Sequence, residues 1–420
     1  MAVLDAPAPH APSAPPPLAT ARTTGPAPTP TGTPAPAATR PRRARDPFVD
    51  VVRALGTLGV VLLHWLMAEA TWDGRTLLVG NALGHGAGWL VTWLQPLALL
   101  FFAAGASAGY QRSVTTVGGR GWGGTIVARL RGVVRPVAAF AGAWALAVAA
   151  LLAVGVPDDA VWRMARMAPQ LLWFLGVWVV LMALTPLLRA AWQRWRWGAL
   201  AVAVALPLAL DALRFGLPGE VTGALAWANV LLAWAAPFLA GIAYASERTA
   251  PRRPALDRTG GPVDPTAGRT ARLLLAAGAL AAVAATVVLV AAGPYPLSLV
   301  GMPGDEISNL GPPTAPVIAH AVAQVCLVLL FRAALVRRAA SGTGARAVGA
   351  LARRSMTVYL WHLTAMFAVV GVALLGLGQE LPAAWGADWW GSRPVWFAAY
   401  LLVLLGLVRV FGRFEDRRRS

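Results

Sequence analysis

Long apolar runs recur along most of this chain, and their length constrains the fold more than any other feature. A helix rises about 1.5 Å per residue, so about 20 apolar residues cross the roughly 30 Å hydrocarbon layer of a bilayer. Inside that layer a helix satisfies its backbone hydrogen bonds within one segment. Such runs lie at residues 47–70, 88–111, 136–155, 169–188, 197–213, 222–245, 273–292, 314–335, 352–375 and 394–411. We therefore predict an all-α, polytopic membrane protein with about ten transmembrane helices.

The composition excludes a water-soluble fold for a chain of this size. Hydrophobic residues make up 57% of the 420 residues and charged residues 13%, with a mean hydropathy of +0.60. The formal net charge of +18 comes from arginines in separate clusters, whereas nucleic-acid-binding proteins gather basic residues on one face. We therefore expect the lipid bilayer as a partner and no nucleic acid. Because Cys326 is the single cysteine, neither a disulfide nor a thiolate metal cluster is expected.

The positions of the arginines test the number of spans, because cytoplasmic connections of membrane proteins carry the excess of positive charge. With the N-terminus inside, ten spans leave in the outer connections only Arg75, Arg163, Arg166, Arg214 and Arg393. The clusters then fall on the cytoplasmic side, at residues 112–135, 189–196, 248–272, 337–354 and 413–419. We predict that both termini are cytoplasmic and that the chain is a multi-pass protein of the cell membrane.

Three segments are expected along the chain. Residues 1–45 are rich in Pro, Ala and Thr and have too few bulky apolar side chains for a core, which predicts a disordered cytoplasmic tail. Residues 46–411 form the membrane domain, and residues 412–420 form a short basic cytoplasmic tail. No second domain is expected after the last span.

Residues 49–67 of the first apolar run contain three ionisable residues, Asp50, Arg53 and His64. Arg53 and His64 are eleven residues apart, which places them on one helix face about 16 Å from each other, and Asp50 lies one turn before Arg53 and can pair with it. An arginine so near a helix end can alternatively extend to the cytoplasmic interface as a topology anchor. His64 lies near the bilayer midpoint, where ionisable residues usually mark a working site. A histidine that only holds two helices together is the alternative.

A second candidate region is RRSMTVYLWHLTAMF, residues 353–367. Ser355, Tyr359 and His362 are spaced by four and three residues and therefore form one polar stripe, with Trp361 beside it. His362 lies two to three turns above the cytoplasmic arginines at its helix start. Two helices thus each carry a histidine deep in the membrane.

Several motifs together carry a resemblance to a known family. The second span contains LLFFAAGAS at residues 99–107, the fourth contains LWF at residues 172–174 followed by Pro186, and VGMPGDEISNLGPPT covers residues 300–314. With the Asp50, Arg53 and His64 pattern and YLWH at residues 359–362, their order and spacing resemble the integral-membrane acyltransferase family 3 over residues 46–411. The 300–314 segment is similar to an external loop of actinobacterial members.

The pair Gly105 and Gly109 predicts close helix packing.

The resemblance implies a membrane enzyme that transfers an acyl group, in our interpretation an acetyl group, from cytoplasmic acyl-CoA to a hydroxyl. Implied acceptors are a sugar, a cell-envelope glycan or glycolipid, or a secondary metabolite. Such a transfer needs a base for the hydroxyl proton and stabilisation of an oxyanion, and histidine suits the first task because its ordinary pKa is near neutral. We predict that His64 is the general base and that His362 orients it, stabilises the oxyanion or shares the proton. No metal and no permanently bound cofactor is expected.

Arginines before the third predicted helix are candidates for the phosphates of the donor. Pro136 is a good first helical residue, so Arg129, Arg131 and Arg135 are expected beside the positive end of the helix dipole. Ordinary cytoplasmic arginines are the alternative. Family members commonly have Arg-x2-Arg here, whereas this chain has Arg131-x3-Arg135. Arg53 is then expected to guide the donor inward, and Asp50, Ser355, Tyr359 and Trp361 complete the predicted substrate site.

Two other functional classes fit part of this pattern. Histidine and arginine inside a membrane also serve proton-coupled secondary transporters, which often show two matching halves with broken helices. The sequence contains no such internal repeat. The second class is a noncatalytic membrane scaffold. It would not explain why the chain buries ionisable side chains in the membrane, which costs free energy.

Overall fold

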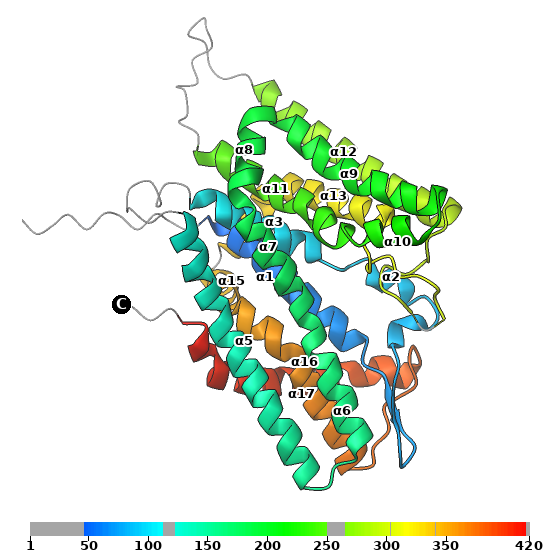
Figure 1. The fold of residues 1–420 in the computed structure, drawn as a ribbon. Helices are drawn as coiled ribbons and strands as arrows, with labels where there is room; N and C mark the ends of the chain where they lie inside the picture. Colours follow the sequence, from blue (N-terminus) through cyan, green and yellow to red (C-terminus); the bar gives the residue numbers. More distant parts are fainter. Residues whose placement is uncertain (1–45, 112–121, 250–264, 303, 341, 417–420) are drawn as a thin grey trace, which may run out of the picture. The chain divides into compact units, whose positions relative to one another are not determined.

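The computed structural model describes residues 46–111, 122–249, 265–302, 304–340 and 342–416. The predicted tail of residues 1–45 and the last four residues lie outside this part of the chain. The described fold consists of helices, 3-10 and π turns and one short hairpin (Figure 1). The helices are α1 (Pro47–Leu66), α2 (Trp89–Thr92), α3 (Leu97–Tyr110), α5 (Trp122–Ala153), α6 (Asp158–Met167), α7 (Leu172–Ala183), α8 (Thr185–Trp195), α9 (Trp197–Gly216), α10 (Glu220–Ala226), α11 (Asn229–Thr249), α12 (Pro265–Ala292), α13 (Ala315–Leu330), α14 (Arg332–Ala339), α15 (Gly342–Arg353), α16 (Ser355–Gly371) and α17 (Ala387–Phe411).

The predicted all-α membrane fold is confirmed. Among the described residues, nine helical segments are long and apolar enough to cross a bilayer, and a tenth is α13 with α14 if this pair, bent by 62°, is one span. We call the end of the bundle at which α1 begins the arginine-rich end, because Arg196, Arg248 and Arg354 lie there. The end at which α1 terminates is called the loop end.

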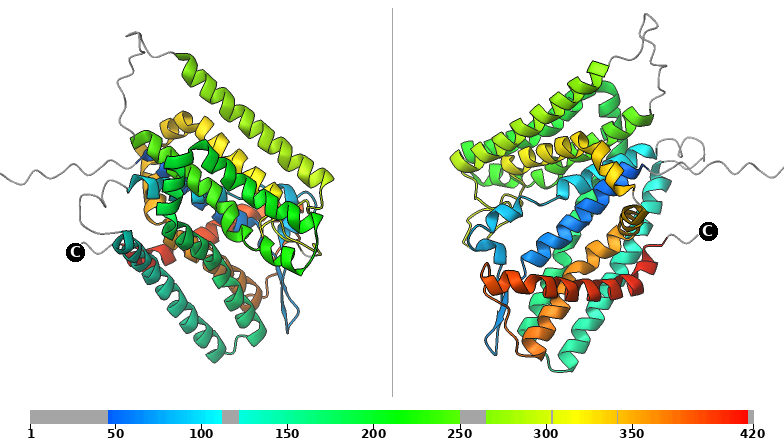
Figure 2. Two further views of the ribbon diagram at one scale, coloured as in Figure 1. Left: turned by 45° about the horizontal axis from the view of Figure 1, so that its top comes forward. Right: turned by 180° about the vertical axis from the view of Figure 1, so that it is seen from behind.

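The most enclosed helices are α1, α3, α11 and α16, and they carry most of the large buried side chains. Helices α5, α9, α12 and α17 are mostly exposed in the isolated chain, with Leu, Val and Trp side chains outward, as lipid-facing helices should be. Figure 2 shows α1, α16 and α17 close together on one side of the bundle. The side chain of Trp65 in α1 contacts the rings of Phe397 and Tyr400 in α17.

Helix α1 begins where its sequence predicts. The Asp46 side chain accepts a hydrogen bond from the backbone N–H of Phe48, and Pro47 occupies the first helical position, where its missing N–H costs nothing. The helix then runs without interruption to Leu66, so His64 lies in its last turn.

The third and tenth spans begin earlier than predicted. Helix α5 starts at Trp122 and contains Pro136, and α17 starts at Ala387 and contains Pro394. Pro136 was expected to be the first residue of its helix, and the tenth apolar run was expected to begin at Pro394. Membrane helices tolerate internal proline, however, because neighbouring groups satisfy the freed carbonyls. Arg129 and Arg135 therefore lie within α5 and not before the positive end of its dipole, so that part of the prediction is wrong. Arg393, expected in an outer connection, is buried within α17.

Helices α3 and α11 are packed almost backbone to backbone. A Cβ atom on Gly105 would overlap the carbonyl oxygen of Phe238, and one on Gly241 would overlap that of Phe102. A Cβ on Gly109 would come within 2.6 Å of the Cβ of Ala245. The predicted close-packing surface of Gly105 and Gly109 is thus confirmed, and its partner is α11.

At the loop end, the chain forms the antiparallel hairpin of β1 (Ala70–Trp72) and β2 (Leu77–Val79). Its turn is held by Asp73, whose side chain accepts hydrogen bonds from the backbone N–H groups of Arg75 and Thr76, and these bonds lower the pKa of Asp73. The backbone N–H of Leu77 donates to Asp159 of α6 at 3.0 Å. The hairpin is therefore fixed beside α6, above the end of α1.

At the arginine-rich end, residues after α17 cap the first turn of α16. The Glu415 carboxylate accepts hydrogen bonds from the backbone N–H groups of Met356 and Thr357 and from the Thr357 hydroxyl. Arg354 binds the Asp416 carboxylate through two nitrogens, at 2.7 and 3.0 Å. Burial raises the pKa of Glu415 even though these hydrogen bonds and Arg354 oppose the shift. The helix that carries His362 is thus anchored at its start.

Replacing Gly105 with leucine should destabilise the bundle by at least about 1–3 kcal/mol, because the side chain would collide with the α11 backbone. Thermal unfolding of the detergent-solubilised protein measures this as a lower midpoint. Gly142→Leu in α5 is the matched control, because a Cβ there meets nothing within 4 Å. Equal midpoints for the two variants would contradict the packing described here.

Removing the Glu415 carboxylate should cost roughly 1–2 kcal/mol, as for the loss of other helix caps. Glu415→Ala is therefore expected to lower the thermal midpoint more than Asp416→Ala, since Asp416 forms an exposed ion pair and such pairs contribute less than about 1 kcal/mol. The reverse order of the two midpoints would show that Arg354 and Asp416 hold this end.

Candidate active site

The two predicted histidines meet inside the bundle. The ring centroids of His64 in α1 and His362 in α16 are 5.0 Å apart, with the ring planes at 64°. His362 is fully buried, whereas His64 is partly accessible. The indole N–H of Trp65 donates to the backbone carbonyl of His362 at 3.1 Å and so ties α1 to α16 beside the pair. Residues 298 positions apart in the chain therefore form one site.

Backbone hydrogen bonds determine which nitrogen of each ring carries a proton. Nδ1 of His64 lies 2.8 Å from the carbonyl oxygen of Val60, and Nδ1 of His362 lies 2.7 Å from that of Tyr359. A carbonyl oxygen only accepts, so each Nδ1 must donate. In the neutral rings both Nε2 atoms then have a free lone pair, and Nε2 of His362 is buried with no hydrogen-bond partner in the described residues. The pair thus offers two neighbouring proton acceptors.

His64 also lines a cavity of about 760 Å³ at the loop end. Its walls come from the segment after α1, the hairpin, α6 with the 3-10 turn η2 (Ala168–Leu171), and the far half of α16 with the π turn η3 (Val372–Gly376). His362 is not part of this lining. A molecule in the cavity would therefore meet His64 first, with His362 behind it.

Asp50 and Arg53 form the predicted ion pair, at 3.2 Å. A second Arg53 nitrogen donates to the hydroxyl of Ser107 in α3 at 2.6 Å, and that hydroxyl in turn donates to the carbonyl of Ala103. Arg53 is thus held between α1 and α3 and is not simply extended to the interface. Sequence analysis did not single out Ser107, although it lies in the LLFFAAGAS motif.

The other predicted residues of α16 differ in their distance from the histidine pair. The Tyr359 ring lies 6.0 Å from that of His362, and its hydroxyl donates to the carbonyl of Leu171. Trp361 instead packs against the rings of Phe140 and Phe411. Ser355 is the first residue of α16, about 10 Å along the axis from His362.

The three arginines of α5 are not part of the histidine site. Arg129 is half-buried and contacts the sulfur of Met182 in α7, while Arg131 and Arg135 have exposed side chains. They remain candidates for binding a polyanion at the arginine-rich end. Within the described residues, no three His, Cys, Asp or Glu side chains gather in a way that could hold a metal ion.

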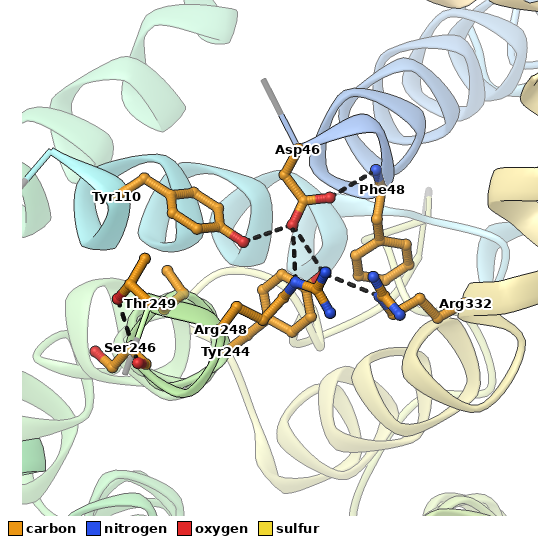
Figure 3. A network of polar contacts seen from close by, with 9 residues as sticks. Asp46, Phe48, Tyr110, Tyr244, Ser246, Arg248, Thr249 and Arg332 are labelled. Carbon is orange, nitrogen blue, oxygen red and sulfur yellow. Dashed lines mark hydrogen bonds and ion pairs between the residues drawn. The ribbon is translucent and has the colours of Figure 1, made fainter. Parts of the chain in front are cut away.

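A polar network that was not predicted from the sequence surrounds Asp46 at the start of α1 (Figure 3). The Asp46 carboxylate accepts hydrogen bonds from the hydroxyls of Tyr110 and Tyr244, at 2.5 and 2.9 Å, and pairs with Arg248. Arg332 donates to the Tyr244 hydroxyl at 3.0 Å. The network joins α1, α3, α11 and α14. Arg332 inside an apolar run was a usable signal, because such residues are rarely unpaired.

Comparison with protein families agrees with this arrangement. Residues 46–411 match the family model described as an acyltransferase domain, of the integral-membrane acyltransferase 3 type. The chain belongs to this family. Searches of curated proteins and of solved structures found no match.

For a membrane acyltransferase, the histidine pair has the geometry that the reaction needs. Acyl transfer to a hydroxyl requires a base within hydrogen-bond reach of the hydroxyl proton and a site from which bulk water is excluded. His64 provides a lone pair at a cavity wall, and the buried His362 provides a second acceptor next to it. The acyltransferase thus has a pair of neighbouring histidines, one of which lines a cavity at the loop end.

If Arg53 binds a substrate of the acyltransferase, Ser107→Ala should raise KM for the acyl donor roughly ten-fold with little change in kcat. The variant removes a hydrogen bond to a charged group, and such bonds contribute about 1.5–3 kcal/mol. Steady-state kinetics with varied donor measure the effect. Ser246→Ala is the control, because Ser246 also donates to the carbonyl four residues back and this hydrogen bond stays within α11. Equal KM values in both variants would remove Ser107 from the site.

Proposed function

We propose that this protein is a membrane O-acyltransferase that transfers an acetyl group from acyl-CoA to a hydroxyl. The acceptor is a sugar, a cell-envelope glycan or glycolipid, or a secondary metabolite. The observation that carries the proposal is the pair of histidine rings 5.0 Å apart, of which His64 lines the cavity. Family membership supports the acyl transfer itself.

In this proposal, His64 is the general base. The acceptor hydroxyl gives its proton to Nε2 of His64, while its oxygen attacks the thioester carbonyl carbon. The C–S bond then breaks, the ester is released, and the thiolate of CoA takes up the proton. His362 shares the proton or stabilises the charge that develops on His64, since its own Nε2 has no hydrogen-bond partner among the described residues.

The donor is proposed to bind from the arginine-rich end. Acyl-CoA carries several phosphates and is cytoplasmic, so this end would face the cytoplasm of a cell membrane. Arg129, Arg131 and Arg135 along the first half of α5 would bind phosphates as separate cations, without help from a helix N-terminus. Arg53, held by Asp50 and Ser107, would guide the pantetheine arm toward the histidines.

Residues of α16 complete the proposed site. Tyr359 holds α16 against η2 through the Leu171 carbonyl and orients His362 from the preceding turn. Ser355 lies at the donor end of the helix, and Trp361 fixes the helix against α5 and α17. A proton-coupled transporter is not favoured, because the family match is to an acyltransferase.

Replacing His64 with glutamine should lower kcat for acceptor-dependent thiol release roughly 10²- to 10⁴-fold, which is the range that general-base catalysis contributes. The assay uses the purified protein in lipid nanodiscs with acetyl-CoA and a thiol reagent. His320→Gln is the control, because His320 in α13 binds Gln324 and lies away from the pair. A folded His64→Gln variant with unchanged turnover would refute the assignment of the base.

A further inference from the structure

The cavity beside His64 is lined almost entirely by apolar side chains. Leu, Val, Ala, Phe, Trp and Met residues form its walls, and besides His64 the polar residues in the lining are Glu69, Asn81 and Gln170. Four of the eight methionines of the chain line it, namely Met67, Met164, Met167 and Met366. Methionine is flexible and polarizable and is used where a surface must adapt to irregular apolar shapes.

The polar groups at the cavity are mostly engaged by the protein itself. A Glu69 carboxylate oxygen lies 2.8 Å from Nε2 of His85, and the Asn81 side chain caps Leu83 and donates to the sulfur of Met302. Gln170 is exposed. Nε2 of His64, whose Nδ1 is engaged by the Val60 carbonyl, is therefore an acceptor at the cavity wall for an incoming hydroxyl.

This pattern discriminates between the acceptor classes of the proposed function. A hydrophilic glycan has hydroxyls on every side, and each hydroxyl that loses water against an apolar wall without a new partner weakens binding. A molecule with an apolar body and one reactive hydroxyl loses no such hydrogen bonds and gains from burial of its surface. The volume of about 760 Å³ is in the usual range for sites that bind drug-sized ligands.

We infer that the acceptor is an apolar, drug-sized alcohol that enters the cavity from the loop end and presents its hydroxyl to His64. This inference rests on the proposed function and narrows its acceptor to the secondary-metabolite class. The hydroxyl proton goes to His64, the oxygen forms the ester bond, and the CoA thiolate leaves and is protonated. The methionines and the aromatic rings of Trp173 and Phe367 contact the apolar body.

The test supplies the full-length protein in nanodiscs with acetyl-CoA and two groups of acceptors. The apolar group contains a macrolactone aglycone, a diterpene alcohol and 1-dodecanol, and the hydrophilic group contains maltose and N-acetylglucosamine oligomers. Mass spectrometry detects the ester, and thiol release measures turnover. We expect kcat/KM to be at least ten-fold higher for the best apolar alcohol than for any glycan. A glycan that is acylated as well as or better than the apolar alcohols overturns the inference and leaves the proposed function standing.

A variant pair tests the cavity directly. Met164→Gln places an amide in the lining and should raise KM for the apolar alcohol at least five-fold. Met356→Gln is the matched control, because Met356 is also half-buried but lies at the start of α16, outside the cavity. An unchanged KM in Met164→Gln overturns the inference.

Two further results would distinguish failure of the inferred acceptor from failure of the proposed function. Native mass spectrometry that finds a phospholipid retained by the wild type and lost in Met164→Gln, with no ester from any apolar alcohol, assigns the cavity to lipid and overturns the inference. If no acetyl-CoA is consumed with any of the apolar alcohols or with any of the glycans, the proposed function and the inference are both overturned.

Discussion

Two hydrogen bonds from imidazole Nδ1 atoms to backbone carbonyls determine the chemistry that the candidate site can perform. His64 donates to Val60 and His362 donates to Tyr359, each within its own helix, where little water competes for these groups. The bonds orient each ring and leave Nε2 unprotonated in the neutral form. Because each ring is fixed to its own helix, the packing of α1 against α16 sets the distance between them. The bond from Trp65 to the His362 carbonyl maintains that packing.

The contact of α3 with α11 has a similar effect on the position of Arg53. Glycines at 105 and 241 allow the two backbones to approach, so α3 occupies a position that no larger residue would permit. Ser107, two residues after Gly105, then reaches Arg53 on α1. The packing of two helices that carry no predicted catalytic residue therefore decides where a charged side chain of the site is held.

Much of this arrangement could be predicted from sequence, because apolar length, helix periodicity and depth are local properties. They gave the approximate spans, the shared stripe of Tyr359 and His362, and the expectation that His64 lies deep in the membrane. The starts of α5 and α17 could not be predicted in this way, since Pro136 and Pro394 look like helix starts until neighbouring helices are known. The hairpin is too short for a period-2 pattern. The side-chain partners of Asp46, which are Tyr110, Tyr244 and Arg248, lie 64 or more residues away in the sequence.

The unequal exposure of the two histidines determines which of them an acceptor in the cavity would contact in the proposed reaction. An acceptor in the cavity contacts His64, whereas His362 is fully buried and has the His64 ring as its near neighbour. In the proposed reaction, an apolar acceptor that fills the cavity would exclude water from the cavity side of His64. A proton taken by His64 would then pass to His362 or to the leaving thiolate. The same apolar walls that would bind the acceptor would therefore protect the acyl donor from hydrolysis.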